Sequence, residues 1–210
     1  MQRDDRKLWL AAAGCVFLFS AAVVSAQAVD PVVMIEEDWE LVVYEPDGDI
    51  MAPQLHTVMS PFAELDPYYA QFSWNYREVP SFQPGGFQVQ AWADDNVLIA
   101  KSFDLDKFSL QEEKFTWTQV MGTDGQNTRF AVVNGYSPTW GVFGGIQALI
   151  GDFAGPADLS GYSTDVSVKN SLVTYGANRV ETFRIVEVRY HGPNGLLYRD
   201  TTPRVVHSAD

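Results

Sequence analysis

Cysteine is almost missing from this sequence of 210 residues. The single cysteine, Cys15, falls in an apolar segment near the N-terminus, and none follows it. If that segment is removed, the rest of the chain can form no disulfide bond. The stability of the remaining domain must then rest on its hydrophobic core.

Basic residues are also scarce, since 14 Lys and Arg stand against 27 Asp and Glu. Without residues 1–28 the chain keeps 11 basic and 25 acidic residues, a net charge of −14. Nucleic acids are recognised through clustered Lys and Arg, so this balance argues against a nucleic-acid partner. The acidic residues are scattered, which is typical of the solvated surface of an exported protein.

Histidines and nucleophile motifs are few as well. The three histidines, His56, His191 and His207, lie far apart and show no metal-ligand spacing. Ser137 and Ser163 each follow a Gly-x pair, but neither is followed by the closing glycine of a nucleophile elbow. The sequence therefore argues against a zinc enzyme and against a serine triad.

The one long hydrophobic run lies at the N-terminus. Basic residues precede it, residues 8–24 carry no charge, and small residues follow. This order is typical of a secretory signal. Cleavage after a small-x-small motif would fall before Gln27 or Val29, and we prefer Val29. The sequence thus predicts a signal peptide over 1–28 and one domain over 29–210, secreted, periplasmic or on the cell surface.

Two alternatives to cleavage concern the same segment. The run is close to the roughly 20 residues that a membrane-spanning helix needs, so an uncleaved anchor is one of them. No basic cluster follows the run, which favours cleavage and a mature chain without a membrane partner. The stretch Ala12-Ala13-Gly14-Cys15 resembles a lipoprotein box, but it has Ala12 where such boxes usually have Leu, and the apolar run continues beyond Cys15.

From Val32 onward the dominant pattern is period-two alternation interrupted by turn-forming residues. Such segments, rich in Val, Ile, Thr and aromatic residues, are typical of half-buried strands. Turn formers stand at Asp94-Asp95-Asn96, Asp124-Gly125 and Pro193-Asn194-Gly195. The pattern predicts an all-β, antiparallel β-sandwich. Its expected strands are 39–44, 69–77, 86–93, 97–103, 114–121, 128–134, 165–175 and 179–191.

The remaining segments are expected to be irregular. The stretch 45–61, with three prolines, indicates an extended loop, and the residues after Pro203 are expected to be frayed. No segment shows convincing helical periodicity. The best helix candidate, 145–153, is short, apolar and flanked by glycine.

The stretch 115–135 carries a Trp-x-x-Val strand, an Asp-Gly turn, and an apolar strand that ends in Val-Asn-Gly. This arrangement resembles the central hairpin of laminin-G-like and concanavalin-A-like jelly-roll domains, over about a tenth of the chain. The resemblance implies a jelly-roll sandwich, with an immunoglobulin-like or other jelly-roll sandwich as the alternative. Domains of this family often bind or cut polysaccharides on the concave sheet.

The catalytic patterns of that family are incomplete here. The glucanase pattern Glu-x-Asp-x-x-Glu would place Glu36 and Asp38 correctly but has Leu41 in the last position. The alginate-lyase pattern Gln-Ile/Val-His has Gln90 where the histidine belongs, and an amide cannot take a proton at neutral pH. The resemblance therefore favours a binding domain over a lyase or glycosidase.

Alternation places several polar residues on one face of two expected strands. Asn75 and Arg77 share a face of the first strand, and Gln88, Gln90 and Trp92 share a face of the second. If the strands are neighbours, amides, a guanidinium and an aromatic ring meet on one surface, which suits the hydroxyls and apolar ring faces of sugars. The alternative is an ordinary solvated sheet face.

Two further residues are weaker members of this site. Gln119 shares a strand with Trp117, which is expected in the core because the equivalent Trp is usually buried in the resembling domains. Trp140 lies in a glycine-rich loop that either leans an aromatic ring over a groove or plugs the edge of the sandwich.

A calcium site is the one cofactor the sequence suggests. Glu45, Asp47 and Asp49 alternate around a glycine and offer hard oxygen ligands. Calcium takes six or more oxygens and only a few are present, so an ordinary Asp-Gly turn is the favoured interpretation.

These observations predict a secreted, non-catalytic carbohydrate-binding or adhesion module whose partner is a polysaccharide or cell-surface glycan. The alternatives are a polysaccharide-degrading enzyme of concanavalin-A-like fold and a structural protein of an envelope or matrix.

Overall fold

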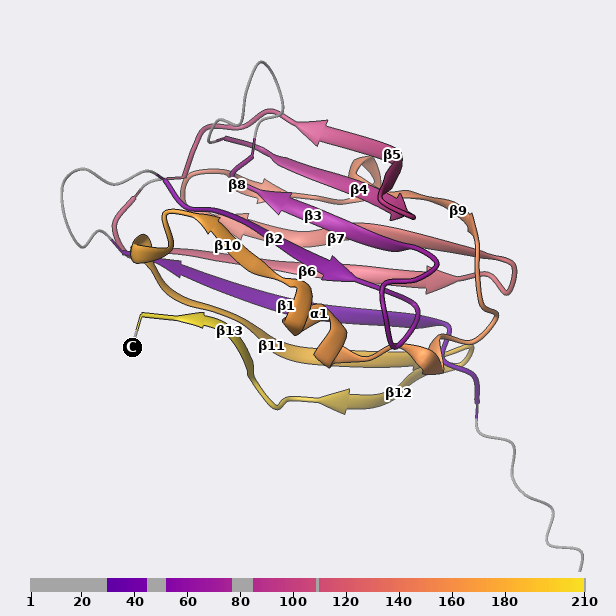
Figure 1. Cartoon of the computed structure of the whole chain (residues 1–210). Coiled ribbons are helices and arrows are strands. Elements are labelled where there is room, and N and C mark those ends of the chain that lie inside the picture. The colour runs from indigo at the N-terminus through magenta and orange to yellow at the C-terminus, as the bar shows by residue number, and fades with distance from the viewer. Residues whose placement is uncertain (1–29, 45–51, 77–84, 109, 210) are drawn as a thin grey trace, which may run out of the picture.

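The fold was described from a computed structural model of the whole chain (Figure 1). The structure describes residues 30–44, 52–76, 85–108 and 110–209. The predicted signal peptide, 1–28, lies outside these residues. No described helix is both long and apolar enough to cross a membrane.

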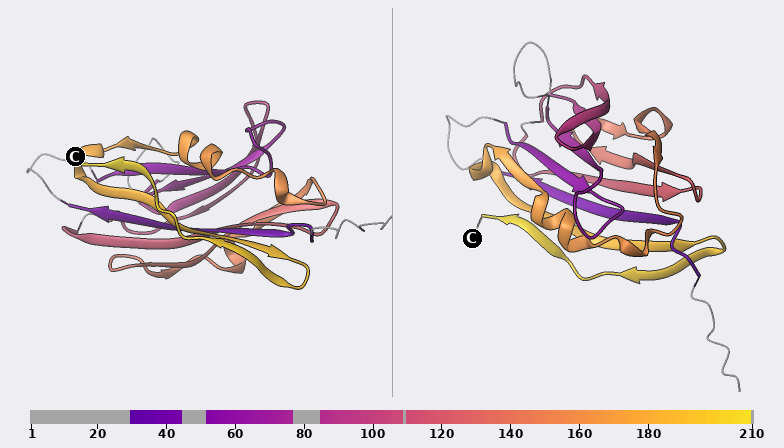
Figure 2. Two further views of the ribbon diagram at one scale, coloured as in Figure 1. Left: turned by 90° about the horizontal axis from the view of Figure 1, so that it is seen from below. Right: turned by 45° about the vertical axis from the view of Figure 1, so that its right-hand side comes forward.

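The chain forms two antiparallel sheets that pack face to face as a sandwich, as the alternation predicted (Figures 1 and 2). Sheet A has the order β12-β11-β1-β6-β7-β8, with β13 paired to β11 and β9 paired to β7. Sheet B has the order β10-β2-β3-β4-β5. The strands of sheet A are β1 (Met34–Val43), β6 (Glu113–Thr123), β7 (Asn127–Ser137), β8 (Gly141–Phe143), β9 (Ile150–Ala154), β11 (Val180–Gly192), β12 (Gly195–Asp200) and β13 (Arg204–Ser208). Those of sheet B are β2 (Gln54–Met59), β3 (Tyr69–Trp74), β4 (Phe87–Ala93), β5 (Asn96–Phe103) and β10 (Leu172–Tyr175).

The core lies between the sheets and is rich in aromatic side chains. Trp74 of β3 and Trp117 of β6 meet across the sandwich with ring centroids 4.4 Å apart. Trp39 of β1 stacks on Trp117 at 6.0 Å, with the two rings nearly parallel. Trp117 is therefore a core residue, as expected, and packing of large aromatic rings stabilises the contact between the two sheets.

The two ends of the β4–β5 hairpin illustrate how the sequence fixes the strand pairing. Ala93 pairs with Asn96 across a two-residue turn in which Asp94 and Asp95 have φ of 47° and 60°. Both central residues of a type I′ turn need positive φ, and Asp is among the few residues that tolerate it. At the other end of β4, a Cβ on Gly86 would lie 2.0 Å from the carbonyl oxygen of Phe103, so only glycine lets the strands approach there.

The expected strand over 165–175 is wrong in its first half. Residues Thr164–Asn170 form a two-turn helix, α1, and only Leu172–Tyr175 is extended, as β10. The helix buries Thr164, Ser167 and, at its C-cap, Ser171. This spacing is helical, but because the buried side chains are polar the hydrophobic pattern does not reveal it.

Three other expectations are corrected. The loop expected over 45–61 contains β2, and the end expected to be frayed contains β13, which pairs with Thr182–Ile185 of β11. The weak helix candidate 145–153 is a single 3-10 turn, η1 (Ile146–Ala148), followed by β9. Two more 3-10 turns, η2 (Leu159–Gly161) and η3 (Ala177–Arg179), flank α1 and β10. The short strands were missed because each gains its stability from its neighbour rather than from its own pattern.

Candidate functional site

A groove of about 290 Å³ opens on the outer face of sheet B. We call it the glutamine groove because three neighbouring strands contribute glutamines to it. It is lined by Gln54, Leu55, His56, Gln71, Ser73, Tyr76, Gln88, Gln90, Trp92 and Thr174.

The register of β2, β3 and β4 arranges the groove in rows. Tyr69 pairs with Trp92 at one end, and Gln71 pairs with Gln90 in the next row. The third row joins His56, Ser73 and Gln88, each directly opposite the next. Rows on one face of a strand are about 7 Å apart, so polar groups follow the aromatic pair at regular steps. The result is an apolar surface at one end and a polar floor beyond it.

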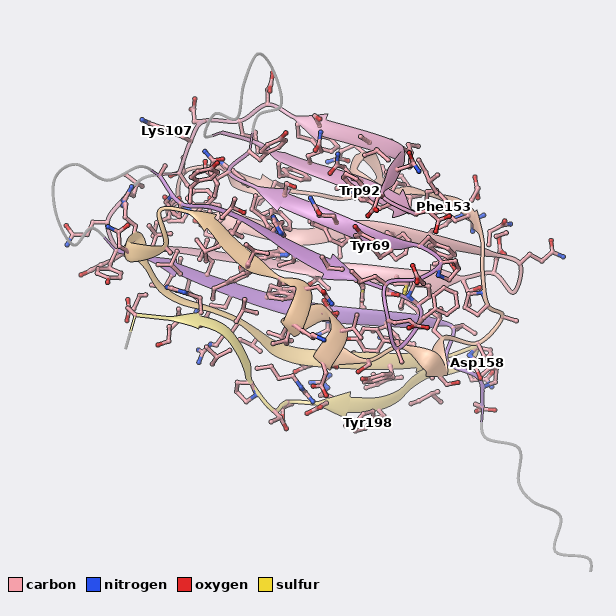
Figure 3. All side chains as sticks on the ribbon, viewed as in Figure 1. Tyr69, Trp92, Lys107, Phe153, Asp158 and Tyr198 are labelled. Carbon is pink, nitrogen blue, oxygen red and sulfur yellow. The ribbon has the colours of Figure 1, made fainter. Side chains whose placement is uncertain are left out.

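The aromatic pair is a flat, partly exposed surface. The rings of Tyr69 and Trp92 are 6.5 Å apart between centroids and nearly parallel, with an interplanar angle of 6°. Figure 3 shows the two side chains close together on strands β3 and β4. Burial, with Asp95 nearby, raises the pKa of Tyr69, so its hydroxyl stays protonated at neutral pH.

Hydrogen bonds orient the amides of the polar floor. The indole Nε1 of Trp92 donates to Oε1 of Gln90 at 3.3 Å, which links the aromatic end to the first glutamine row. Nε2 of Gln88 donates to Oγ of Ser102 on β5 at 2.8 Å. Nε2 of Gln71 lies 3.4 Å from Oγ of Ser73. These bonds hold the planar amides in place before any ligand arrives.

His56 is uncharged in this setting. Its Nδ1 lies 3.3 Å from Oγ1 of Thr174, and burial lowers the pKa of the imidazole below its ordinary value of 6.5. Burial disfavours the charged form of a base, so the ring is neutral at pH 7. The described lining of the glutamine groove therefore carries no formal charge at that pH.

The structure brings together three of the predicted site residues. Gln88, Gln90 and Trp92 share the outer face of β4, as alternation predicted. Arg77 lies outside the described residues.

Asn75 does not join the groove, which corrects the expected alternation. Asn75 follows the end of β3 with φ of 56°, and this left-handed step turns its side chain to the interior, where it is fully buried. Its Nδ2 donates to the carbonyl oxygen of Pro53 at 2.7 Å, and its Oδ1 accepts from the amide of Phe108 at 3.2 Å. Because of the same step, Tyr76 takes a place in the groove.

The two weaker members also lie elsewhere. Gln119 is fully buried between the sheets and donates a hydrogen bond to the hydroxyl of Thr57 on β2. Trp140 is almost buried and packs edge-on against Phe115, with centroids 5.1 Å apart. Its indole donates to the carbonyl oxygen of Asp106, so the loop closes the end of the sandwich rather than leaning over a groove.

The proposed calcium ligands Glu45, Asp47 and Asp49 lie outside the described residues. Within the described part of the chain, no cluster of three or more acidic, His or Cys side chains could hold a metal ion.

Sequence reasoning missed several residues of the groove. Gln54 and His56 were missed because β2 was taken for part of a loop. Gln71 had a usable signal, since it lies two residues before Ser73 on the same alternating strand. Thr174 was hidden by the helix that interrupts its expected strand.

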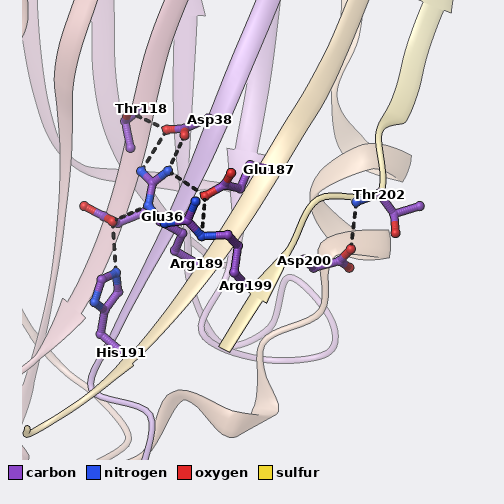
Figure 4. Close-up of polar contacts among 9 residues, drawn as sticks. All are labelled: Glu36, Asp38, Thr118, Glu187, Arg189, His191, Arg199, Asp200 and Thr202. Atoms are coloured by element: carbon purple, nitrogen blue, oxygen red, sulfur yellow. Dashed lines mark hydrogen bonds and ion pairs between the residues drawn. The ribbon is translucent and has the colours of Figure 1, made fainter. Parts of the chain in front are cut away.

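A larger hollow, of about 410 Å³, lies on the outer face of sheet A, but its charges are already paired. Arg189 of β11 contacts Asp38 and Glu36 of β1 and Glu187 of its own strand (Figure 4). Nε2 of His191 lies 2.9 Å from Glu36. These contacts hold the pKa of Arg189 above its ordinary value. A charged ligand would have to break this network, so the hollow is a weaker candidate than the groove.

A carboxyl group is buried on the core side of β1. Glu37 of β1 is fully buried and accepts hydrogen bonds from Tyr162 at 2.6 Å, Ser167 at 2.5 Å and the indole of Trp39 at 2.9 Å. Burial raises the pKa of this carboxyl to about 7, although the three hydrogen bonds oppose the shift. It lies on the core side, away from both outer faces.

Comparisons with known proteins give little guidance. No family model and no curated protein matches the sequence. Among solved structures, the chain is similar to scytalidoglutamic peptidase crystallised with a peptide-based transition-state analogue. The two are 10% identical, with 84% of this chain and 83% of that chain covered and a TM-score of 0.34. A likeness this slight supports no inference about chemistry, since one architecture hosts many unrelated functions.

Proposed function

We propose that this chain is a non-catalytic carbohydrate-binding or adhesion module of the cell exterior, with the glutamine groove as its ligand site. The observation that carries the proposal is the stacked pair of Tyr69 and Trp92 at the head of a glutamine floor. A sugar ring has an apolar face and a rim of hydroxyls. The first suits an aromatic surface, and the second suits side chains that both donate and accept hydrogen bonds.

Two further observations support the proposal. The domains that the hairpin 115–135 resembles often bind polysaccharides on a sheet face. The N-terminal segment has the order of a secretory signal, which would deliver the domain to where such glycans occur.

The test measures binding to soluble polysaccharides by affinity electrophoresis, for the parent and for Trp92→Ala. We expect Trp92→Ala to lose most of the affinity, because the indole supplies both the stacking surface and the hydrogen bond to Gln90. The control is Tyr136→Ala, which removes a 53% exposed ring from β7 of sheet A and should change nothing. If no glycan is retained, or if Trp92→Ala binds like the parent, the proposal is wrong.

A second assay separates binding from degradation. The bound polysaccharide is incubated with the protein, and new reducing ends and unsaturated products are measured. A binding module leaves the chain length unchanged, whereas release of shorter products would identify a polysaccharide-degrading enzyme.

A further inference from the structure

Gln54 has a hydrogen-bonding capacity that the fold does not use. It opens β2 on the outer face and lines the glutamine groove, and its side chain is only 1% exposed. Within the described part of the chain, neither Nε2 nor Oε1 of Gln54 has a hydrogen-bond partner.

Such an amide is unusual in a folded protein. Buried polar groups nearly always find partners, because a donor or acceptor that loses water without replacement destabilises the folded state. Asn75, one residue beyond the neighbouring strand β3, shows the ordinary case, since both ends of its amide are bonded. Gln54 differs in that it adjoins an open groove, so a ligand can complete what the chain leaves unpaired.

The shape of the amide restricts the ligand. Its NH₂ group donates and its carbonyl oxygen accepts, about 2.3 Å apart in one plane by ordinary covalent geometry. Two hydroxyls on adjacent carbons match this pair, since one can accept while the other donates. An amide of this kind can therefore bind a diol through one donated and one accepted hydrogen bond.

The charge of the groove restricts the ligand further. His56, the only titratable base in the described lining, is kept neutral by burial. A carboxylate or sulfate would have to leave water without a cation to receive it, which is strongly unfavourable. The described lining thus favours a ligand without charge.

We propose that the glutamine groove takes an uncharged glycan and that Gln54 is its specificity-determining residue, binding two neighbouring hydroxyls of one sugar unit. This inference rests on the proposed function and goes beyond it. A carbohydrate-binding module could equally bind acidic sugars, and Gln54 could serve packing alone.

The experiment compares neutral polysaccharides (laminarin, arabinoxylan and galactomannan) with polyuronates (polygalacturonate and alginate). Binding and melting temperature are measured for the parent and for Gln54→Met, with Gln126→Met, an exposed turn position, as the control. We expect the parent to retain a neutral polysaccharide and no polyuronate. Gln54→Met should weaken that binding about tenfold or more while the melting temperature stays equal or rises, because an unpaired buried amide is lost. The control should match the parent in both.

A second measurement needs no variant. The retained polysaccharide is O-methylated, which removes its hydroxyl donors, and the parent should no longer bind it.

The outcomes separate the inference from the proposed function. Retention of polyuronates, unchanged affinity of Gln54→Met, a clear fall in its melting temperature, or binding of the O-methylated glycan would each overturn the inference, even while Trp92→Ala still abolishes binding. Failure of the parent to bind any glycan, or an unaffected Trp92→Ala, would instead overturn the proposed function.

Discussion

The hydroxyl of Tyr162 donates a hydrogen bond of 2.6 Å to the buried carboxyl of Glu37, joining the loop before α1 to the central strand of sheet A. Ser167 of α1 donates to the same oxygen at 2.5 Å. This buried acid holds the short helix against the sandwich, and its protonation state is therefore tied to the stability of the fold.

Stability should fall as the pH rises through the range in which Glu37 titrates. Burial raises the pKa of the folded carboxyl from 4.5 to about 7, so between these values the folded state binds a proton that the unfolded state has released. The Glu37 contribution is fully present below pH 4.5, declines up to about pH 7, and is constant above it. Its total size is about 3 kcal/mol. Urea unfolding from pH 4 to 8 measures it.

Other groups titrate in the same range, so the comparison is with Glu37→Gln, which cannot ionise. The difference in unfolding free energy between parent and variant should change by about 3 kcal/mol from pH 4.5 to 7. Glu181→Gln, at an exposed position of β11, is the matched control and should give a constant difference. A pH-independent difference for Glu37→Gln would show that Glu37 ionises normally.

Asn75→Ala should destabilise the protein by about 3 kcal/mol. The change leaves the carbonyl oxygen of Pro53 and the amide of Phe108 without their partner, and it forces alanine into a left-handed conformation. Chemical denaturation measures the loss. The remaining folded protein should bind glycan like the parent. If Asn75→Ala is as stable as the parent but no longer binds glycan, Asn75 belongs to the ligand site and its assignment to the interior is wrong.

Arg189→Met should cost about 1–3 kcal/mol at low salt, because Asp38, Glu36 and Glu187 lose the guanidinium that they share and then repel one another, although Arg199 still contacts Glu187. Salt screens that repulsion, so the loss should shrink in 1 M NaCl.

Arg129→Met is the control for Arg189, since its partners Asp124 and Asp152 are well exposed. Exposed pairs contribute little, so we expect a clearly smaller change than for Arg189→Met. Equal effects of the two substitutions, measured by urea unfolding at both salt concentrations, would contradict the assigned network.

Deletion of residues 204–210 should lower the unfolding free energy by about 2 kcal/mol. It removes β13 from the edge of β11, the packing of Val206 against the core, and the 2.6 Å ion pair between Arg204 and Asp200. Thermal unfolding measures the shift. An unchanged melting temperature would mean that this end contributes nothing, as a frayed terminus would.

Much of the fold could be read from the sequence where one strand face is apolar. The strand 86–93 was found with nearly its observed bounds, because Phe87, Val89 and Ala91 alternate with polar residues. The helix α1 was not found, because its fully buried residues, Thr164 and Ser167, and the buried C-cap Ser171 are polar and carry no hydrophobic period. Hydrophobic patterns detect burial only where the buried atoms are apolar.

The candidate site was predictable along single strands and not between them. Alternation placed Gln88, Gln90 and Trp92 together, but it could not show that β2 lies beside β3 and adds Gln54 and His56. For Asn75 the prediction was wrong for a local reason. The positive φ of Asn75 breaks the alternation of β3 at that residue, and alternation alone does not mark where such a break occurs.

The hydroxyl of Thr57 accepts hydrogen bonds from the indole of Trp74 on its own sheet and from Gln119 on the other. Dispersion between two apolar layers has little directional preference, whereas a hydrogen bond restricts the alignment of its two partners. The hydroxyl oxygen of Thr57 therefore helps to fix the alignment of the two sheets. Thr57 follows His56 in the chain, so the same hydrogen bonds also fix the position of the glutamine groove relative to the opposite sheet. With Thr57→Val the layers should still pack together, but they would lose this directional contact between them.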